Sequence, residues 1–109
     1  MNTLFKRTCI FGALVFLFNP AYAADPAEAL AQKNGCLMCH GMQNAVLGPS
    51  YKDVAQKYKD DKAAEAKLVE KVKVGGGGVW GKIPMPANSP KVKDDDIKTI
   101  VKWILTKSY

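Results

Sequence analysis

Apolar residues recur at helical spacing in two stretches of the chain, and polar or glycine-rich segments separate them. The clearer stretch lies near the carboxyl end, with apolar positions at i, i+3, i+4, i+7 and i+8: Ile97, Ile100, Val101, Ile104 and Leu105. This spacing predicts a helix with one core-facing stripe. We expect Asp94, Asp95 and Asp96 to cap this helix and to complement its dipole. Trp103 falls off the centre of the stripe, and we expect it to pack at the edge.

A second, weaker stripe predicts a helix that begins at Asp60 or Asp61 and ends near Val74. Lysines separate its inward positions, which are Ala64, Leu68, Val69 and Val72. The glycine run 75–78 then ends the helix, because glycine readily adopts the backbone conformations that follow a helix.

Capping patterns predict two shorter helices. Asp25 is placed to cap a helix that begins at Pro26, a residue that suits the first helical position. Ser50 and Asp53 form a capping box that starts a helix running to about Tyr58. Because no stretch shows a convincing strand pattern, the sequence predicts an all-α domain.

Residues 1–23 have the organisation of a cleaved secretory signal peptide. Lys6 and Arg7 precede an apolar run, and the segment ends in Ala-Tyr-Ala, a small-x-small cleavage pattern. The alternative is a retained membrane anchor, but the apolar run is about ten residues long against the ~20 that a spanning helix needs. We therefore expect cleavage and one domain at residues 24–109, exported to the bacterial periplasm and not stably inserted in a membrane.

Charge and size narrow the classes of partner. The whole chain carries 16 basic and 10 acidic side chains, a formal net charge of +6. Loss of Lys6 and Arg7 with the leader removes two positive charges and still leaves a basic domain that suits an acidic partner. Nucleic acid is not indicated, because the lysines are spread singly and are not interleaved with aromatic residues. So small a domain benefits from a buried cofactor that completes its core.

The segment Cys36-Leu37-Met38-Cys39-His40 has the pattern of a c-type haem attachment site. On a helical turn, residues three and four apart share a face. Both sulfurs can therefore add to the two vinyl groups of one porphyrin edge while His40, the single histidine of the chain, points at the iron.

Two other interpretations of the cysteines are a thioredoxin-like redox pair and half of a zinc site. A structural zinc site normally needs four Cys or His ligands, and the chain without its leader offers three. A thioredoxin fold needs strands around a βαβ unit, which the sequence does not show. Haem attachment is therefore the favoured interpretation.

A second iron ligand is sought among the methionines. Met1 would leave with the leader, and Met38 lies inside the attachment turn. Met42 follows His40 by two residues, and at ~3.5 Å per residue its sulfur cannot pass around the edge of a macrocycle. Met85 has ample chain and stands between two prolines that hold it extended. The alternative is that Met85 fills a gap in the core.

Two further residues have open roles at this point. The Pro49 carbonyl is a possible acceptor for the Nδ1–H of His40, a bond of the kind that orients a ligand imidazole, or it belongs to an ordinary turn. The indole N–H of Trp80 needs a partner if it is buried, which a haem propionate would supply, and simple packing is the alternative.

The whole of residues 24–109 resembles the short single-haem class I cytochromes c of bacterial periplasms, the cytochrome c-551/c-552 group. The resemblance is carried by Asn34-Gly35-Cys36 through His40, Gly48-Pro49, Tyr51-Lys52-Asp53-Val54-Ala55, Gly78-Val79-Trp80-Gly81, Ile83-Pro84-Met85-Pro86, Asn88 and Lys102-Trp103-Ile104-Leu105. It implies one small all-α domain of four to five helices around a covalently bound haem, with the first and last helices crossing.

The resemblance also implies roles for individual residues. It makes Cys36 and Cys39 the thioether sites, His40 the proximal ligand and Met85 the distal ligand of a six-coordinate iron. By the same likeness the Pro49 carbonyl orients the histidine, Lys71 and Trp80 lie near a haem propionate, and Asn88 braces the methionine side. Two departures concern the propionates: the glycine run lacks the Asn or Ser that relatives often have, and Lys71 cannot give the bidentate fork of an arginine.

The expected function is that of a soluble periplasmic electron carrier and not an enzyme. A histidine and methionine pair raises the potential of haem iron and leaves no position open for substrate. Expected partners are electron donors and acceptors such as a terminal oxidase, nitrite reductase or peroxidase, docked through lysines near the haem edge, first of all Lys33, Lys52 and Lys82. The alternatives are a haem enzyme or gas sensor with an open sixth position, and a thiol oxidoreductase or metal module with free cysteines.

Overall fold

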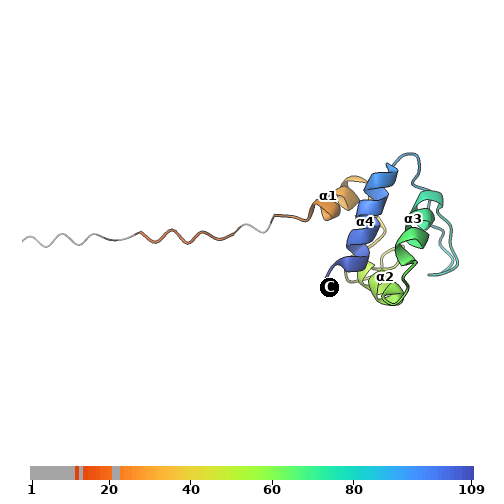
Figure 1. Ribbon diagram of the computed structural model, residues 1–109, viewed down its shortest axis with the longest axis horizontal. Coiled ribbons are helices and arrows are strands. Elements are labelled where there is room, and N and C mark those ends of the chain that lie inside the picture. Colours follow the sequence, from red (N-terminus) through yellow and green to blue (C-terminus); the bar gives the residue numbers. More distant parts are fainter. Residues whose placement is uncertain (1–11, 13, 21–22) are drawn as a thin grey trace, which may run out of the picture.

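The computed structural model describes residues 12, 14–20 and 23–109. Most of the expected signal peptide, including Lys6 and Arg7 and part of its cleavage pattern, lies outside the described residues. Residues 14–20 form neither helix nor strand, and Figure 1 shows this segment extending away from the folded domain. Among the described residues, no helix is both long and apolar enough to cross a membrane.

Four α-helices and one short 3-10 turn make up the domain, and the expected all-α fold is confirmed. In chain order the elements are α1 (Pro26–Lys33), η1 (Cys36–Met38), α2 (Tyr51–Tyr58), α3 (Ala64–Val74) and α4 (Asp94–Thr106). The described part of the chain contains two isolated β-bridges and no strand.

Two helices begin where their capping residues predicted. The Asp25 carboxylate accepts the N–H of Ala27 at 2.8 Å, and α1 begins at Pro26. The Ser50 hydroxyl accepts the N–H of Asp53 at 3.1 Å, and α2 begins at the residue after Ser50. Each bond satisfies one of the N–H groups that a helix start leaves without a partner.

The expected starts of the other two helices were wrong in part. Asp61 accepts the N–H of Ala63 at 2.9 Å, so it closes a turn in front of α3 and does not start the helix. At α4 the capping position is Lys93, and no side chain caps the helix. The three aspartates lie in its first turn, where they complement the helix dipole without capping it.

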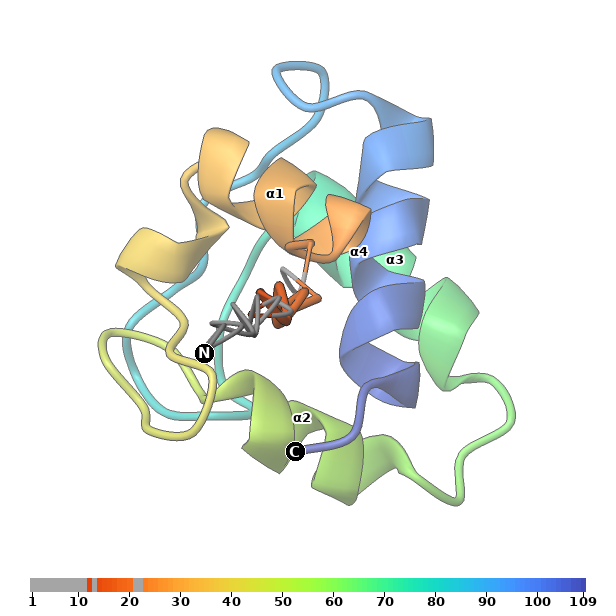
Figure 2. The ribbon, with the colours of Figure 1, turned by 90° about the vertical axis from the view of Figure 1, so that its left-hand side faces the viewer.

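Helix α4 is the centre of the fold, because α1, α2 and α3 all pack against it. Figure 2 shows α1 lying across α4, as the resemblance implied. The predicted stripe of α4 is buried at Ile97, Ile100, Val101 and Ile104 and half-buried at Leu105.

The expectation that Trp103 packs at an edge was wrong. Its side chain is 7% exposed and belongs to a core cluster with residues of α1 and α2. Its ring meets that of Tyr51 edge to face, with centroids 5.7 Å apart. Neighbouring helices cover α4 on more than one side, so a residue off the predicted stripe is buried as well.

Candidate functional site

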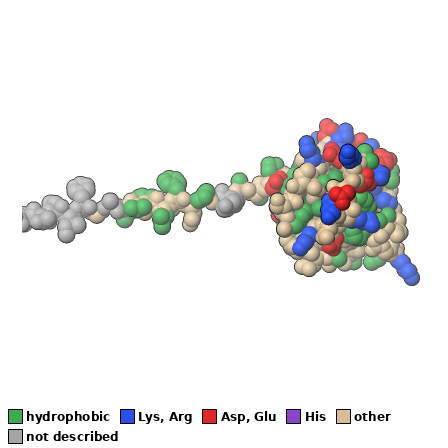
Figure 3. Space-filling view, turned by 60° about the horizontal axis from the view of Figure 1, so that its bottom comes forward, with side chains coloured by type: hydrophobic (Ala, Val, Ile, Leu, Met, Phe, Trp, Pro, Cys, Tyr) green, Lys and Arg blue, Asp and Glu red, His purple; other side chains and the backbone are tan. Residues whose placement is uncertain are grey.

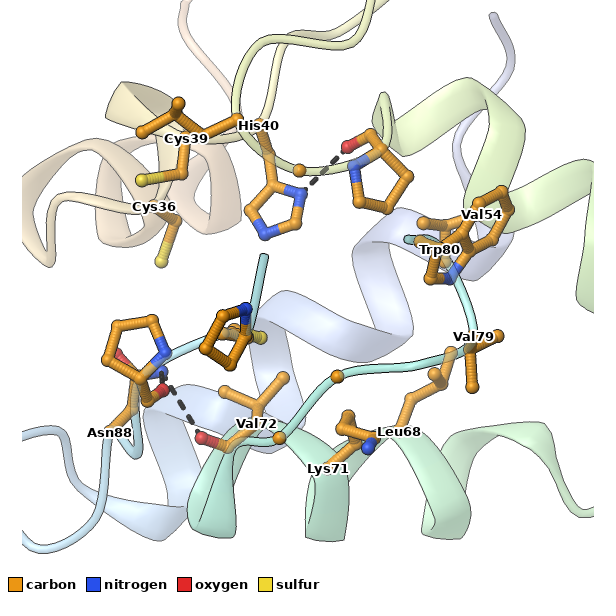
Figure 4. A pocket seen from close by; sticks show the side chains of 18 of the residues that line it. Cys36, Cys39, His40, Val54, Leu68, Lys71, Val72, Val79, Trp80 and Asn88 are labelled. Carbon is orange, nitrogen blue, oxygen red and sulfur yellow. Dashed lines mark hydrogen bonds between the residues drawn. The ribbon is translucent and has the colours of Figure 1, made fainter. Parts of the chain in front are cut away.

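A cavity of about 690 Å³ lies between the turn at η1, helices α2, α3 and α4, and the loop 75–88. Its volume is in the range of cofactor sites. All eight site residues expected from the sequence line this one cavity: Cys36, Cys39, His40, Pro49, Lys71, Trp80, Met85 and Asn88. Most of the remaining lining is apolar, and Figure 4 shows the cavity from close by.

The attachment motif forms a tight turn that places its three chemical groups at one edge of the cavity. Gly35 has φ 75° and leads from α1 into η1, and the His40 N–H donates to the Cys36 carbonyl at 3.0 Å. Both cysteines are half-buried, and neither forms a disulfide. Figure 4 shows their sulfur atoms beside the imidazole, an arrangement suited to two thioether bonds along one edge of a porphyrin.

The imidazole of His40 is oriented by the main chain. Its Nδ1 lies 2.7 Å from the Pro49 carbonyl oxygen. Because a carbonyl can only accept, Nδ1 carries the proton and Nε2 keeps the lone pair that a metal ligand needs. Of the two roles left open for Pro49, this geometry favours orientation of the histidine.

Two neighbours hold the plane of the ring. The Tyr51 ring stacks on the imidazole with centroids 5.4 Å apart and an angle of 17° between the planes. A Cβ on Gly48 would lie 2.7 Å from Cε1 of His40, so only a residue without a side chain allows the loop to lie against the ring. The sequence contained both residues, but nothing in its pattern indicated these contacts.

Burial affects the ionisation of groups beside the attachment turn. It raises the pKa of the Cys36 thiol, and the Tyr51 hydroxyl that hydrogen-bonds to the thiol lowers it in part. Burial also raises the pKa of Tyr51 itself. Both groups are therefore neutral at pH 7.

Met85 also lines the cavity, on a loop that is tied to α3. Met85 and Gly76 exchange two backbone hydrogen bonds of 2.9 Å each. The Asn88 amide donates to the Val72 carbonyl at 3.2 Å and to the Pro86 carbonyl at 3.1 Å. In Figure 4, His40 and Asn88 lie on opposite sides of the cavity. This arrangement allows the imidazole and the thioether to approach a planar group from its two faces.

The other two methionines in the described part of the chain lie elsewhere. Met42 packs against the core cluster that contains Trp103, and Met38 is 77% exposed. Neither lines the cavity. The choice of Met85 by chain length therefore agrees with the positions of all three residues.

Lysines are among the residues that line the cavity in which a propionate was expected. Lys71 and Trp80 line it together with Lys67 and Lys82. Trp80 is 44% exposed, and Nζ of Lys57 lies over the Trp80 ring, 5.4 Å from its centroid, a cation–π contact that the sequence did not indicate. Lys67 is paired with Asp61 at 2.9 Å, so Lys71 and Lys82 are the lysines of the lining whose charge suits a cofactor that carries carboxylates.

The three lysines expected in docking occupy different surroundings. Lys82 lines the cavity, whereas Lys33 and Lys52 are exposed and do not line it. Figure 3 shows lysines interspersed with acidic side chains on the face that it presents. A docking surface built on lysines is therefore best sought at the cavity mouth near Lys82.

The lining also includes apolar residues that sequence reasoning had placed only in the core. Leu68 and Val72 of α3 are half-buried because they face the cavity, and the α4 stripe contributes Ile97 and Ile100. Helical periodicity indicated that these side chains point inward. It contained no information on whether they meet protein or a cofactor.

The described part of the chain gives no support to the two other interpretations of the cysteines. In residues 23–109 no three His, Cys, Asp or Glu side chains come together as a metal site. The same residues form no strand, which excludes a thioredoxin-like βαβ unit there.

The sequence matches the family model Cytochrome c over residues 24–108. It is 55% identical to cytochrome c-551 of Allochromatium vinosum over 86 residues, which are 79% of this chain and 88% of that protein. It is 48% identical to cytochrome c-552 of Nitrosomonas europaea over 106 residues, 97% of this chain and 98% of that protein. The fold is similar to the crystal structure of wild-type Nitrosomonas europaea cytochrome c552, with a TM-score of 0.71, 47% identity, and coverage of 74% of this chain and 99% of that one.

Proposed function

The chain belongs to the cytochrome c family, and on that premise we propose that it carries single electrons in the periplasm through a haem c whose iron is held by His40 and Met85. Membership in the family makes it an electron-carrier protein with a covalently bound haem c, and not an enzyme. The ligand pair, the six-coordinate iron, the compartment and the partners belong to the proposal.

The observation that carries the proposal is that His40 and Met85 line the same cavity as Cys36 and Cys39. When bound, the haem supplies a redox-active iron and an extended π system through which one electron can enter or leave. The Pro49 carbonyl keeps the proton on Nδ1 of His40 and leaves Nε2 as the donor atom. His40 and Met85 would then hold the iron together, and no coordination position would be open to a substrate.

The surroundings of the two ligands favour the reduced state. A thioether is a soft donor that stabilises ferrous iron, so a methionine ligand raises the potential. Apolar side chains from α3 and α4 line the cavity and exclude water, which disfavours additional positive charge inside it. In this proposal Lys71 and Trp80, which line the cavity, meet a propionate, and Asn88 holds the loop of the methionine through its bond to Val72.

Two features support the proposal that the protein is exported: the expected signal peptide and the point at which the cytochrome c domain begins. The match to the cytochrome c family begins at residue 24, the residue after the expected cleavage point. Residues 14–20 form no helix or strand, although Leu14 and Phe18 are large apolar residues, 80% and 94% exposed. A mature protein that begins at Ala24 would be released into the periplasm. There it would exchange electrons with partners such as a terminal oxidase, nitrite reductase or peroxidase.

The ligand assignment is tested by comparing Met85→Ala with Met42→Ala. Met85→Ala should keep its haem through the two thioethers and His40 while it loses the weak near-infrared band of sulfur bound to ferric iron. It should also bind carbon monoxide readily when ferrous, and its potential should fall because water or hydroxide replaces the thioether. Met42 packs in the core away from the cavity, so Met42→Ala should retain the band and the potential.

Two results would contradict the proposal. Loss of the band in Met42→Ala but not in Met85→Ala would show that the ligand assignment is wrong. Rapid binding of carbon monoxide by the unmutated protein would show an open sixth position and would favour a haem enzyme or gas sensor. Covalent haem staining on a denaturing gel tests the attachment itself, since Cys36→Ser and Cys39→Ser should each lower the yield of holoprotein.

A further inference from the structure

The end of α3 and the segment that carries Met85 form one hydrogen-bonded unit. In the last turn of α3, the Val72 carbonyl accepts the backbone N–H of Asn88 at 3.1 Å. One residue beyond the C-cap position of this helix, Gly76 and Met85 exchange two backbone hydrogen bonds of 2.9 Å each. A helix end leaves carbonyls without partners, and here the Met85 segment supplies a partner. These bonds therefore fix the backbone of Met85 relative to α3.

Gly75 lies where the two segments come closest. A Cβ on this residue would overlap the Met85 carbonyl oxygen and would lie 2.7 Å from the Ala87 nitrogen and 2.8 Å from the Pro86 carbonyl carbon. All three are main-chain atoms, which cannot rotate away as the end of a flexible side chain could. Gly75 is itself buried, so a Cβ added to it could not point into solvent.

The backbone conformation of Gly75 is a second, independent reason why this position needs glycine. Its φ of 73° and ψ of −158° fall in a region that is essentially restricted to glycine. This conformation turns the chain at the end of α3, while the Gly75 N–H still donates to the Lys71 carbonyl at 2.7 Å. The turn presents Gly76 to Met85 in the orientation that their paired hydrogen bonds need.

We propose that Gly75 is a positioning residue for Met85. Because it has no side chain, the main chain of residues 85–87 lies directly on the end of α3, and this contact sets where the thioether stands in the cavity. A Cβ at position 75 pushes residues 85–87 away from α3 and breaks the bridge to Gly76. Met85 then occupies its ligand position in only part of the molecules. The inference rests on the ligation by His40 and Met85 proposed above.

The neighbouring glycines provide a graded series of controls. A Cβ on Gly77 would lie 3.3 Å from the Cα of Pro84, a tighter contact than most and with the same segment. A Cβ on Gly78, which like Gly77 lines the cavity, would meet no protein atom within 4 Å, although Gly78 has a positive φ of 96°. Gly78→Ala therefore introduces the backbone strain of a positive φ without the contact to the Met85 segment.

The test uses holoproteins of Gly75→Ala, Gly77→Ala and Gly78→Ala with haem covalently attached. Gly75→Ala should lose most of the near-infrared band, and its apparent affinity for carbon monoxide should rise about tenfold or more, in proportion to the fraction of open molecules. Gly77→Ala should lie between this variant and the unmutated protein, and Gly78→Ala should match the unmutated protein in both measurements. Helix content and thermal unfolding, recorded in parallel, separate an effect on the ligand from general loss of structure.

The results that would overturn the inference differ from those that would overturn the ligand assignment. If Gly75→Ala keeps the band and the unmutated affinity for carbon monoxide, Gly75 does not position Met85. If Gly75→Ala yields no folded holoprotein, the comparison of Gly77→Ala with Gly78→Ala decides, and equal values overturn the inference. If the unmutated protein lacks the band and binds carbon monoxide as readily as Met85→Ala, the proposed ligation itself fails.

Discussion

Replacement of Asn88 by alanine should release Met85 from the iron in a measurable fraction of molecules. The Asn88 amide donates two hydrogen bonds that tie the loop together, to the Val72 carbonyl at 3.2 Å and to the Pro86 carbonyl at 3.1 Å. The backbone N–H of Asn88 also donates to Val72, at 3.1 Å, and this bond remains in the alanine variant. The substitution therefore loosens the loop without detaching it.

The size of the effect follows from these bonds. A hydrogen bond of this kind contributes about 0.5–1.5 kcal/mol net, and the bond to Pro86 is exposed, so we expect a loss of about 1–2 kcal/mol. If this loss falls on the closed state of the loop, the open fraction rises about 5- to 30-fold. Carbon monoxide binds only to the open state, so its apparent affinity for the ferrous protein should rise by the same factor.

Carbon monoxide titration of the ferrous protein measures this factor, and the near-infrared band of the ferric protein gives an independent reading. Asn34→Ala is a matched control, because Asn34 also donates from its amide to a carbonyl in the last turn of a helix, that of Leu30 at 2.9 Å. The control should lower the free energy of unfolding without changing carbon monoxide affinity. The reasoning would be refuted if Asn88→Ala destabilised the fold but left carbon monoxide affinity at the unmutated value.

Three further predictions concern stability, pH and docking. Ile97 is 1% exposed, so Ile97→Ala should lower the free energy of unfolding by about 2–5 kcal/mol in denaturant titrations, whereas Val46→Ala, at a site 61% exposed, should change it by less than about 0.5 kcal/mol. Burial raises the pKa of Tyr109 to about 12 from 10.0, so between these values the folded protein keeps a proton that the unfolded chain loses. Stability should therefore fall as pH rises from about 10, and less steeply in Tyr109→Phe; an unchanged slope would assign the loss to other groups. Electron transfer to an acidic partner should slow as salt is added, and Lys82→Gln, at the cavity, should weaken this salt dependence more than Lys33→Gln does.

Local chemistry made a large part of this structure predictable. The attachment motif, the cap at Asp25 and the cap at Ser50 each depend on residues within a few positions of one another, so the sequence contains everything that decides them. Met85 could be selected because chain length and flanking prolines are also properties of the sequence. The boundary of α3 was less certain, because Asp61 could close a turn or start a helix, and both choices satisfy a backbone N–H.

Features that depend on how segments meet could not be predicted in the same way. The burial of Trp103 follows from the packing of α1 and α2 on α4, which one helical stripe does not reveal. The contact of Lys57 with the Trp80 ring joins α2 to a distant loop. The glycine run indicated the end of a helix, but the close approach of Gly75 to residues 85–87 exists only in the folded chain.

Main-chain groups help to hold both proposed iron ligands, which bears directly on the choice between a carrier and an enzyme. A backbone carbonyl orients His40, and a backbone bridge to Gly76 fixes Met85. The backbone groups that make these contacts do not gain or lose protons near neutral pH. They move only if the helices and loops that carry them move. Both ligands should therefore stay in place when the charge on the iron changes by one unit. A site that rearranges so little suits the transfer of an electron, and it leaves no room for the coordination changes that catalysis at the iron would require.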